Sequence, residues 1–244
     1  SVVAAVLLGG LSAAQAQLDT RHWIPALWSP DAGQTSNHCL MLSTPEVGNV
    51  PVTVTDGAGV EIWRGDVTNA QPVAVRLRGS CGLRQAAQTG AGNARVVTGA
   101  NSVNQVHSRG LVITAAQPVY ANLRHKLGAQ GMSLTAKGRK ALGTNFRAGF
   151  MLERRKNQNY RGVFISVMAT EDDTTVVFDQ FKPGIVLYQT ETAGNPATTA
   201  PIEVTLQANE SYIVGIYQPG WAGSADLDDF NGTRVTSNKP VAMV

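Results

Sequence analysis

The chain has 244 residues, of which 43% are hydrophobic and 15% charged, with a formal net charge of +3 and a sequence pI near 9.0. This apolar content is enough for a buried core and argues against wholesale disorder, and the length suits two ordinary domains or one large one. The positive charge is too weak and too dispersed to favour a nucleic acid as partner.

Residues 1–16 have the pattern of a secretory signal remnant. A short apolar run at 2–8 is followed by the small-residue cleavage pattern of Ala14 and Ala16. The run is too short to cross a bilayer as a helix, and a buried N-terminal strand or helix is the alternative. We therefore expect a secreted or cell-surface protein, held at a membrane only by an anchor outside this sequence. The absent charged n-region, and an end at Val244 within an expected strand, predict a fragment.

Strand signals dominate the rest of the chain. Residues 52–55, 73–78 and 202–207 alternate apolar and polar residues with period two, as half-buried strands do. Residues 162–168 are almost continuously apolar, which suits a strand buried on both faces. Turn residues separate these runs, and Asn209 with Glu210 predicts a hairpin between the strands at 204–206 and 212–214.

No long amphipathic helix is evident. Residues 133–142 are basic and predict a short helix or a linker, and residues 86–104 and 190–201 predict long polar loops, the first with a short strand near 95–98. The second half yields six or seven strands, around Phe146 and at 163–168, 175–178, 202–206, 212–216, 233–236 and 241–244. This density predicts an all-β fold of β-sandwich-like modules, with a propeller of four-stranded blades as the alternative.

The second half repeats the first in outline. Residues 110–120 match residues 232–242 around Pro118 and Pro240, and residues 42–46 match 168–171 around Thr44 and Thr170. A repeat of roughly 100 residues or more is too long for a solenoid unit and fits a small domain copied in tandem. We expect a first β module at 17–135 and a second at 136–244, the latter truncated at its C-terminus.

Cys39 and Cys81 both fall in the first of these modules. In an oxidising compartment they predict one disulfide, and two unpaired thiols are the alternative. Closing a loop of about 40 residues would stabilise the fold by roughly 3–4 kcal/mol in the chain-entropy treatment.

Four motifs of the second module, taken in order, resemble a known family. They are residues 142–146 (LGTNF), 167–176 (VMATEDDTTV), 204–212 (VTLQANESY) and 232–242 (GTRVTSNKPVA). Together they resemble the N-terminal domain of IgGFc-binding proteins, over roughly residues 22–244 and most strongly from about 142 onward.

The resemblance implies an extracellular, non-catalytic module. The family is linked in animals to mucus and to binding of the Fc part of immunoglobulin G, and related bacterial surface domains are linked to adhesion. The A-x-A signal and the low cysteine content resemble a bacterial member. The first module departs from the pattern, because residues 43–46 lack the acidic pair found at Asp172 and Asp173.

Two acidic segments are candidates for metal binding. Residues 171–173 are interpreted as turn chemistry rather than a Ca²⁺ site, because consecutive acids in extended chain point in different directions. Asp226, Asp228 and Asp229 form a second candidate, but Phe230 stands at the third ligand position of a calcium loop and no Glu follows at the twelfth. We therefore expect no cofactor, with Ca²⁺ at these three aspartates as the alternative.

Patterns of catalysis are absent from the sequence. The four histidines, His22, His38, His107 and His125, have no zinc-ligand spacing and are interpreted as scattered surface or half-buried side chains. There is no nucleophile-elbow or phosphate-loop pattern, although paired carboxylates for glycoside hydrolysis are left open. We expect a protein that is not an enzyme.

Ligand contacts are expected from loops. Trp221 lies in a Pro- and Gly-flanked loop and could stack on a ligand, Arg154 and Arg155 form a short basic cluster, and Trp63 is expected in the core. The predicted function is extracellular binding or adhesion with a protein or glycan ligand. The alternatives are a carbohydrate-binding or accessory part of a larger secreted polysaccharide-active enzyme, or a structural spacer. The sequence assigns no oligomeric state.

Overall fold

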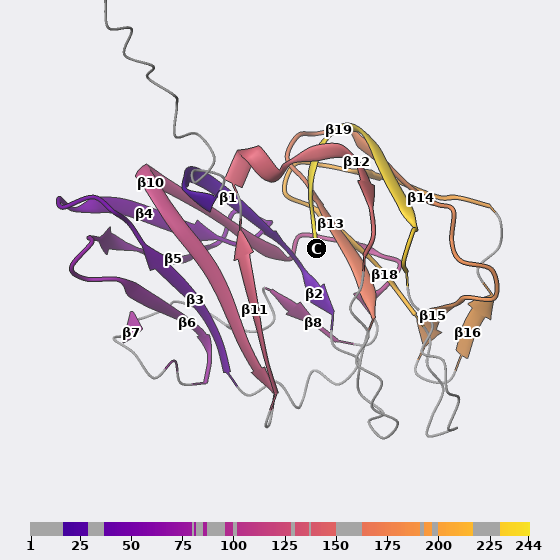
Figure 1. The fold of residues 1–244 in the computed structure, drawn as a ribbon, viewed down its shortest axis with the longest axis horizontal. Helices are drawn as coiled ribbons and strands as arrows, with labels where there is room; N and C mark the ends of the chain where they lie inside the picture. The colour runs from indigo at the N-terminus through magenta and orange to yellow at the C-terminus, as the bar shows by residue number, and fades with distance from the viewer. Residues whose placement is uncertain are drawn as a thin grey trace, which may run out of the picture.

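The computed structural model describes residues 17–28, 37–79, 81, 85–86, 96–99, 102–127, 130–136, 138–149, 163–190, 193–196, 200–216 and 230–244. These residues form strands and turns with no α-helix among them, and one 3₁₀ turn, η5 (Gly138–Ala141), connects the two halves. No helix within the described ranges is long and apolar enough to cross a membrane. The all-β prediction is confirmed, and Figure 1 shows the two sheets side by side.

The first sheet has eight strands and is organised around one long strand, β10 (Gly110–Leu127). The first part of β10 pairs with β1 and β4, and the last part pairs with β3 and β11. Its members are β1 (Asp19–Pro25), β3 (Asn37–Ser43), β4 (Val50–Thr55), β5 (Glu61–Val67), β6 (Val73–Arg78), β7 (Gln85–Ala86), β10 and β11 (Gln130–Ala136). Because β10 changes partners midway, the sheet curls over its own core.

The second sheet has seven strands and is organised in the same way around β19 (Arg234–Met243). The first part of β19 pairs with β12 and β14, and the last part pairs with β13. Its members are β9 (Val106–His107), β12 (Gly143–Arg147), β13 (Phe164–Ala169), β14 (Thr174–Asp179), β17 (Ile202–Leu206), β18 (Ser211–Gly215) and β19. Two small pairs complete the fold, β2 (Leu27–Trp28) with β8 (Val97–Thr98), and β15 (Val186–Thr190) with β16 (Ala193–Pro196).

Five strands have the same order in both sheets, namely β5-β4-β10-β3-β6 and β17-β14-β19-β13-β18. Each long strand carries a proline where its partners change, and proline suits a break in a ladder because it has no N–H to donate. The Thr44 hydroxyl donates to the Pro118 carbonyl at 2.9 Å, and the Thr170 hydroxyl donates to the Pro240 carbonyl at 2.7 Å. Curled sheets of this size are not propeller blades, which have four strands.

One expected connection is wrong. The turn at Asn209 and Glu210 does join β17 to β18, but these strands do not form a hairpin: β17 pairs with β14, and β18 pairs with β13. At this turn the chain crosses from the edge strand β17 to β18, which lies three strands farther along the curled sheet than β14. Asn209 takes a positive φ of 66°, which fits the turn chemistry that the sequence indicated.

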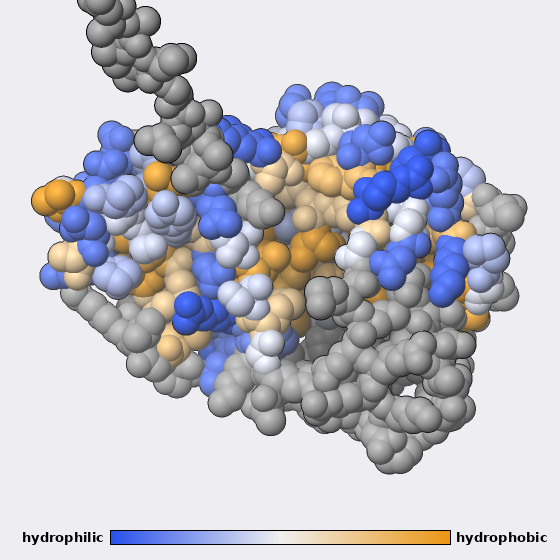
Figure 2. Space-filling view, in the orientation of Figure 1, coloured by the Kyte–Doolittle hydropathy of each residue, from blue (hydrophilic) through white to orange (hydrophobic). Residues whose placement is uncertain are grey.

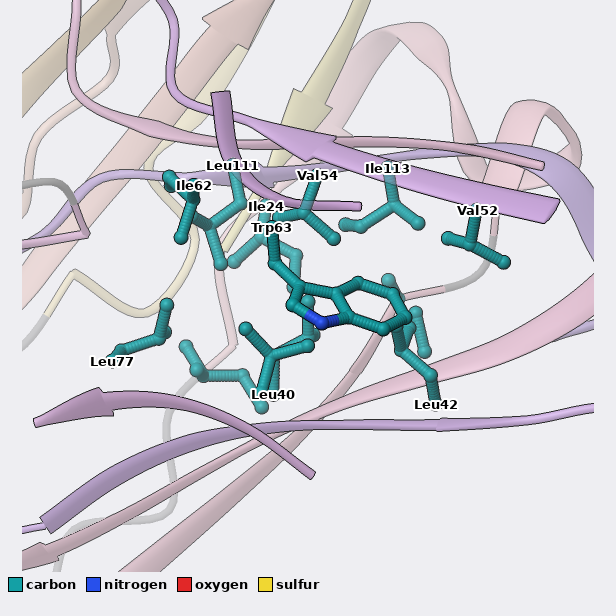
Figure 3. Close-up of a cluster of buried hydrophobic side chains, with 14 of the residues drawn as sticks. Ile24, Leu40, Leu42, Val52, Val54, Ile62, Trp63, Leu77, Leu111 and Ile113 are labelled. Atoms are coloured by element: carbon teal, nitrogen blue, oxygen red, sulfur yellow. The ribbon is translucent and has the colours of Figure 1, made fainter. Parts of the chain in front are cut away.

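Each sheet encloses its own apolar core. In the first, Trp63 of β5 is only 9% exposed and lies, as expected, among aliphatic side chains, including Val54 of the neighbouring strand β4 and Leu40 and Leu42 of β3 (Figure 3). The second core is formed by alternate residues of β13, β14 and β19, with Phe178 and Phe230 fully buried. The alternation read from the sequence at residues 52–55 and 73–78 is confirmed in the first core, which contains Val52, Val54, Val75 and Leu77.

The two halves also pack against each other. Trp23 and Val112 of the first sheet contact Met168 and Ala242 of the second, with Leu142 beside them. This contact explains why β13 is buried on both faces, since Ile165 and Val167 belong to the second core while Met168 points to the first sheet. Apolar residues gather between the two halves in the space-filling view (Figure 2).

A second contact involves strands that precede the expected module boundary. Trp28 of β2 packs edge-on against Tyr188 and Phe164, with ring centroids 4.9 and 6.4 Å away. Strand β9 pairs with β18 and so completes the second sheet from within the first half of the sequence. The expected division between residues 135 and 136 falls within the last residues of β11, just before η5. As a division into independent modules it stays a prediction.

Candidate binding surface

Three of the four family-like motifs meet at one end of the second sheet. They supply the turn 170–173 between β13 and β14, the turn 207–210 between β17 and β18, and Asn238 with Lys239 in β19. We call these three segments the motif turns. Hydrophilic residues gather over this part of the molecule, where β14 and β19 lie (Figures 1 and 2).

Acidic side chains tie the first two segments together. The Asp172 carboxylate accepts the backbone N–H of Ala208 at 2.9 Å, and the Asp173 carboxylate accepts the Gln207 side-chain amide at 3.1 Å. Asp173 has a positive φ of 52°. The turn interpretation of residues 171–173 agrees with these bonds. No group of three or more metal-ligating side chains occurs within the described ranges.

Strand β19 holds the first of these turns, 170–173, from the other side. Lys239 donates from Nζ to the Asp172 carbonyl at 2.6 Å, and the Asn238 amide donates to the Asp173 carbonyl at 3.3 Å. The Asn238 side-chain oxygen in turn accepts the Thr175 backbone N–H at 2.8 Å. These bonds fix the positions of the turns before any ligand arrives, which reduces the entropy lost on binding.

The surface that results is exposed and acidic. Glu171, Asp172 and Asp173 are exposed, while Glu210 and Lys239 are half-buried. Four carboxylates against one ammonium give a negative local charge on rigid turns. Such a surface is suited to a polar or basic patch on a partner, and loops on a rigid scaffold are where binding usually resides.

The first half braces this surface. The Trp23 indole N–H donates to the Asn209 side-chain oxygen at 3.2 Å, and Arg21 lies over the Trp23 ring at 4.8 Å. The backbone of Gly57 approaches Asn209 so closely that a Cβ there would lie 2.4 Å from the Asn209 carbonyl oxygen. The motif turns are therefore positioned by both sheets, which the sequence motifs alone did not reveal.

The structure does not describe the ligand and metal residues that the sequence predicts. Trp221, Arg154, Arg155, Asp226, Asp228 and Asp229 are outside the described residues, as is the expected signal at 1–16. The other three tryptophans, Trp23, Trp28 and Trp63, are all buried, so none of them offers an exposed face for a sugar ring.

The predicted disulfide is confirmed. Cys39 and Cys81 are bonded with a Cα–Cα distance of 5.7 Å and a sequence separation of 42. The bond attaches residue 81 to β3, and loop-closure entropy predicts a stabilisation of roughly 3–4 kcal/mol.

The interpretation of all four histidines as surface or half-buried side chains is wrong for two of them. His22 and His38 are fully buried, while His107 and His125 are half-buried. The His22 Nε2 contacts the carbonyl oxygens of Val119 at 2.9 Å and Asp19 at 3.1 Å, so this nitrogen is the donor. Burial lowers the pKa of His22 and keeps the ring neutral.

An ion pair that the sequence did not predict ties η5 to β1. Arg139 donates from its backbone N–H at 2.9 Å and from Nε at 3.0 Å to the Asp19 carboxylate. Burial would raise the pKa of Asp19, but the hydrogen bonds from Arg139 outweigh it and lower the pKa to about 2. Gly138 has a φ of +65°, and a Cβ there would lie 2.4 Å from the Asp19 Cβ.

Taken together, the described residues form an all-β fold whose motif turns are exposed and held by hydrogen bonds. Residues 132–244 match the model of a family described as IgGFc binding protein, and this segment contains all four motifs that carried the resemblance. The resemblance is thereby confirmed for the second half, and the weaker resemblance before residue 132 lies outside the match. No curated protein and no solved structure matches the chain.

Proposed function

We propose that this chain is a non-enzymatic extracellular module that binds a protein ligand through the motif turns. The match of residues 132–244 to the IgGFc-binding family carries this proposal. Three of the four motifs within the matched segment converge on one exposed, hydrogen-bonded surface, which is how a recognition surface is expected to form. Immunoglobulin Fc and mucin are the ligand candidates that the family suggests.

We further propose that the two sheets are copies of one ancestral module. Their common strand order and the matching threonine-to-proline hydrogen bonds support this. The copies have diverged at the turns, because the first lacks the acidic pair of the second. The ligand is therefore assigned to the second copy, with the first serving as its brace.

Binding is tested with the secreted protein on a biosensor carrying IgG, its Fc fragment or purified mucin. We expect saturable binding to one of these ligands. Glu171→Lys should lower the affinity at least about tenfold, because a charge at the rim of an interface helps to attract the partner and to align the two surfaces. The Glu171 side chain is exposed, and its turn is held through the backbone carbonyl, which accepts the Thr174 hydroxyl at 2.7 Å.

Glu203→Lys is the matched control. It makes the same charge change at an exposed position on the edge strand β17, away from the motif turns. Equal weakening by both variants would show a general charge effect and would reject the motif turns as the surface. Absence of binding to all three ligands would contradict the proposed function.

A further inference from the structure

Two histidines far apart in the sequence meet at one end of the first core. His38 of β3 and His125 of β10 are directly opposite each other in the antiparallel register. Their rings are in contact, with centroids 4.4 Å apart and planes at 82°. Alternate residues of a strand share one face, so His38 lies on the same face of β3 as the core residues Leu40 and Leu42. Both rings therefore lie on the inner face of the sheet.

The polar atoms of this pair are unusual for a buried site. Neither Nδ1 nor Nε2 of His38 finds a hydrogen-bond partner among the described residues, nor does Nε2 of His125, and all three atoms are shielded from solvent. A buried polar atom without a partner costs about 1–3 kcal/mol, so three within two touching rings require an explanation. A group that accepts a lone pair from each ring would satisfy two of these three nitrogens at once and reduce the penalty.

The neighbouring strand places a positive charge beside the pair. Arg78 of β6 lies opposite His38 in the antiparallel register. A neutral imidazole is the form that binds metals.

We propose that His38 and His125 form a bidentate site for a divalent transition-metal ion such as Cu²⁺ or Zn²⁺. Imidazole is a preferred ligand of these ions, and rotation about the broad χ2 wells can turn one nitrogen of each ring toward a shared ion. Water completes the coordination from the side of His125, which is half-buried rather than fully enclosed. This inference does not depend on the proposed function.

Two features make the site testable. Both cysteines are in the disulfide, so no thiolate competes as a ligand while the protein stays oxidised. The charge of Arg78 opposes a cation beside His38, which predicts that Arg78→Gln tightens binding.

The experiment is calorimetric titration of the oxidised protein with Cu²⁺ and with Zn²⁺ at pH 7.5. We expect each chain to bind one ion, with a higher affinity for Cu²⁺ than for Zn²⁺, as in the general order of metal affinities. The affinity should fall at least about tenfold in His125→Gln and in His38→Gln. His107→Gln is the matched control, because His107 also has two shielded nitrogens without partners among the described residues but lies on β9 in the other sheet.

A readout that does not require a folded variant accompanies the titration. In the unmodified protein, metal should slow the acylation of His125 by diethylpyrocarbonate and should leave His107 unaffected. Absence of binding by either ion, or binding equally weakened by His107→Gln, would overturn the proposal, as would metal that leaves the His125 acylation rate unchanged.

Discussion

At the scale of single residues, the Asp19–Arg139 pair is a sharp determinant of stability. Asp19→Asn removes a buried carboxylate that accepts several hydrogen bonds, which should lower the free energy of unfolding by about 1–3 kcal/mol. Because the pKa of Asp19 is lowered from 3.8 to about 2 in the folded state, this stabilisation is present above pH 3.8 and is lost as the pH falls through 2. Urea unfolding between pH 5 and pH 2 measures it, and an equal acid dependence in the variant would contradict it.

Gly138 provides a second test at this scale. Gly138→Ala should destabilise the protein by about 1–3 kcal/mol or more, because its φ of +65° is strained for alanine and the new Cβ would meet Asp19. Gly184→Ala separates the two causes, since Gly184 has a φ of +86° but open space around it. Thermal melts of both variants should show the larger loss for Gly138→Ala, and equal losses would reject the steric contribution.

At the scale of the elements, the threonine hydroxyls at the two corners should act alike. Thr44→Val leaves the Pro118 carbonyl without its hydroxyl donor at a position where the ladder changes partners, which should cost about 1 kcal/mol. Thr170→Val should cost less, because its bond to Pro240 is exposed to water. Denaturant midpoints of the two variants measure both losses, and no loss in Thr44→Val would mean that water replaces the hydroxyl.

The sequence predicted where the strands lie along the chain better than it predicted which strands pair with each other. Period-two alternation located the inward faces of β4 and β6, and apolar continuity located the doubly buried β13, because both signals are local. Local turn chemistry found the bend at Asn209 but could not show which strands the chain joins. The His38–His125 pair was missed for the same reason, since only the register of β3 with β10 brings the rings together. The alternation of His38 with Leu40 and Leu42 was the signal that could have indicated an inward imidazole.

At the scale of the whole molecule, the two sheets should unfold together. Trp28 of the first half is 5% exposed and packs on Tyr188 and Phe164 of the second, and β9 completes the second sheet. We expect one cooperative transition for the intact chain and a loss of about 3–5 kcal/mol in Trp28→Ala. Calorimetry of both proteins measures this, and two separate transitions in the unaltered chain would contradict it.

Acid lability is the other property that belongs to the whole chain. All four histidines have a pKa below 6.5 in the folded state, mainly because burial penalises the charged ring, and those of His107 and His38 fall to about 4 and about 3. The unfolded chain therefore binds more protons than the folded one below pH 6.5, so stability is full above that pH and falls as the pH drops toward 4 and then 3. Between its folded-state and unfolded-state pKa values, each histidine lowers the free energy of unfolding by up to about 1.4 kcal/mol for each unit that the pH falls.

Melting temperatures measured from pH 7.5 to pH 4 should decline before Asp19 begins to protonate. In His107→Gln the decline should be smaller, because unfolding takes up about one proton fewer. A flat profile over this range would show that the imidazoles are charged in the folded protein, and the same profile in His107→Gln would remove that residue from the set.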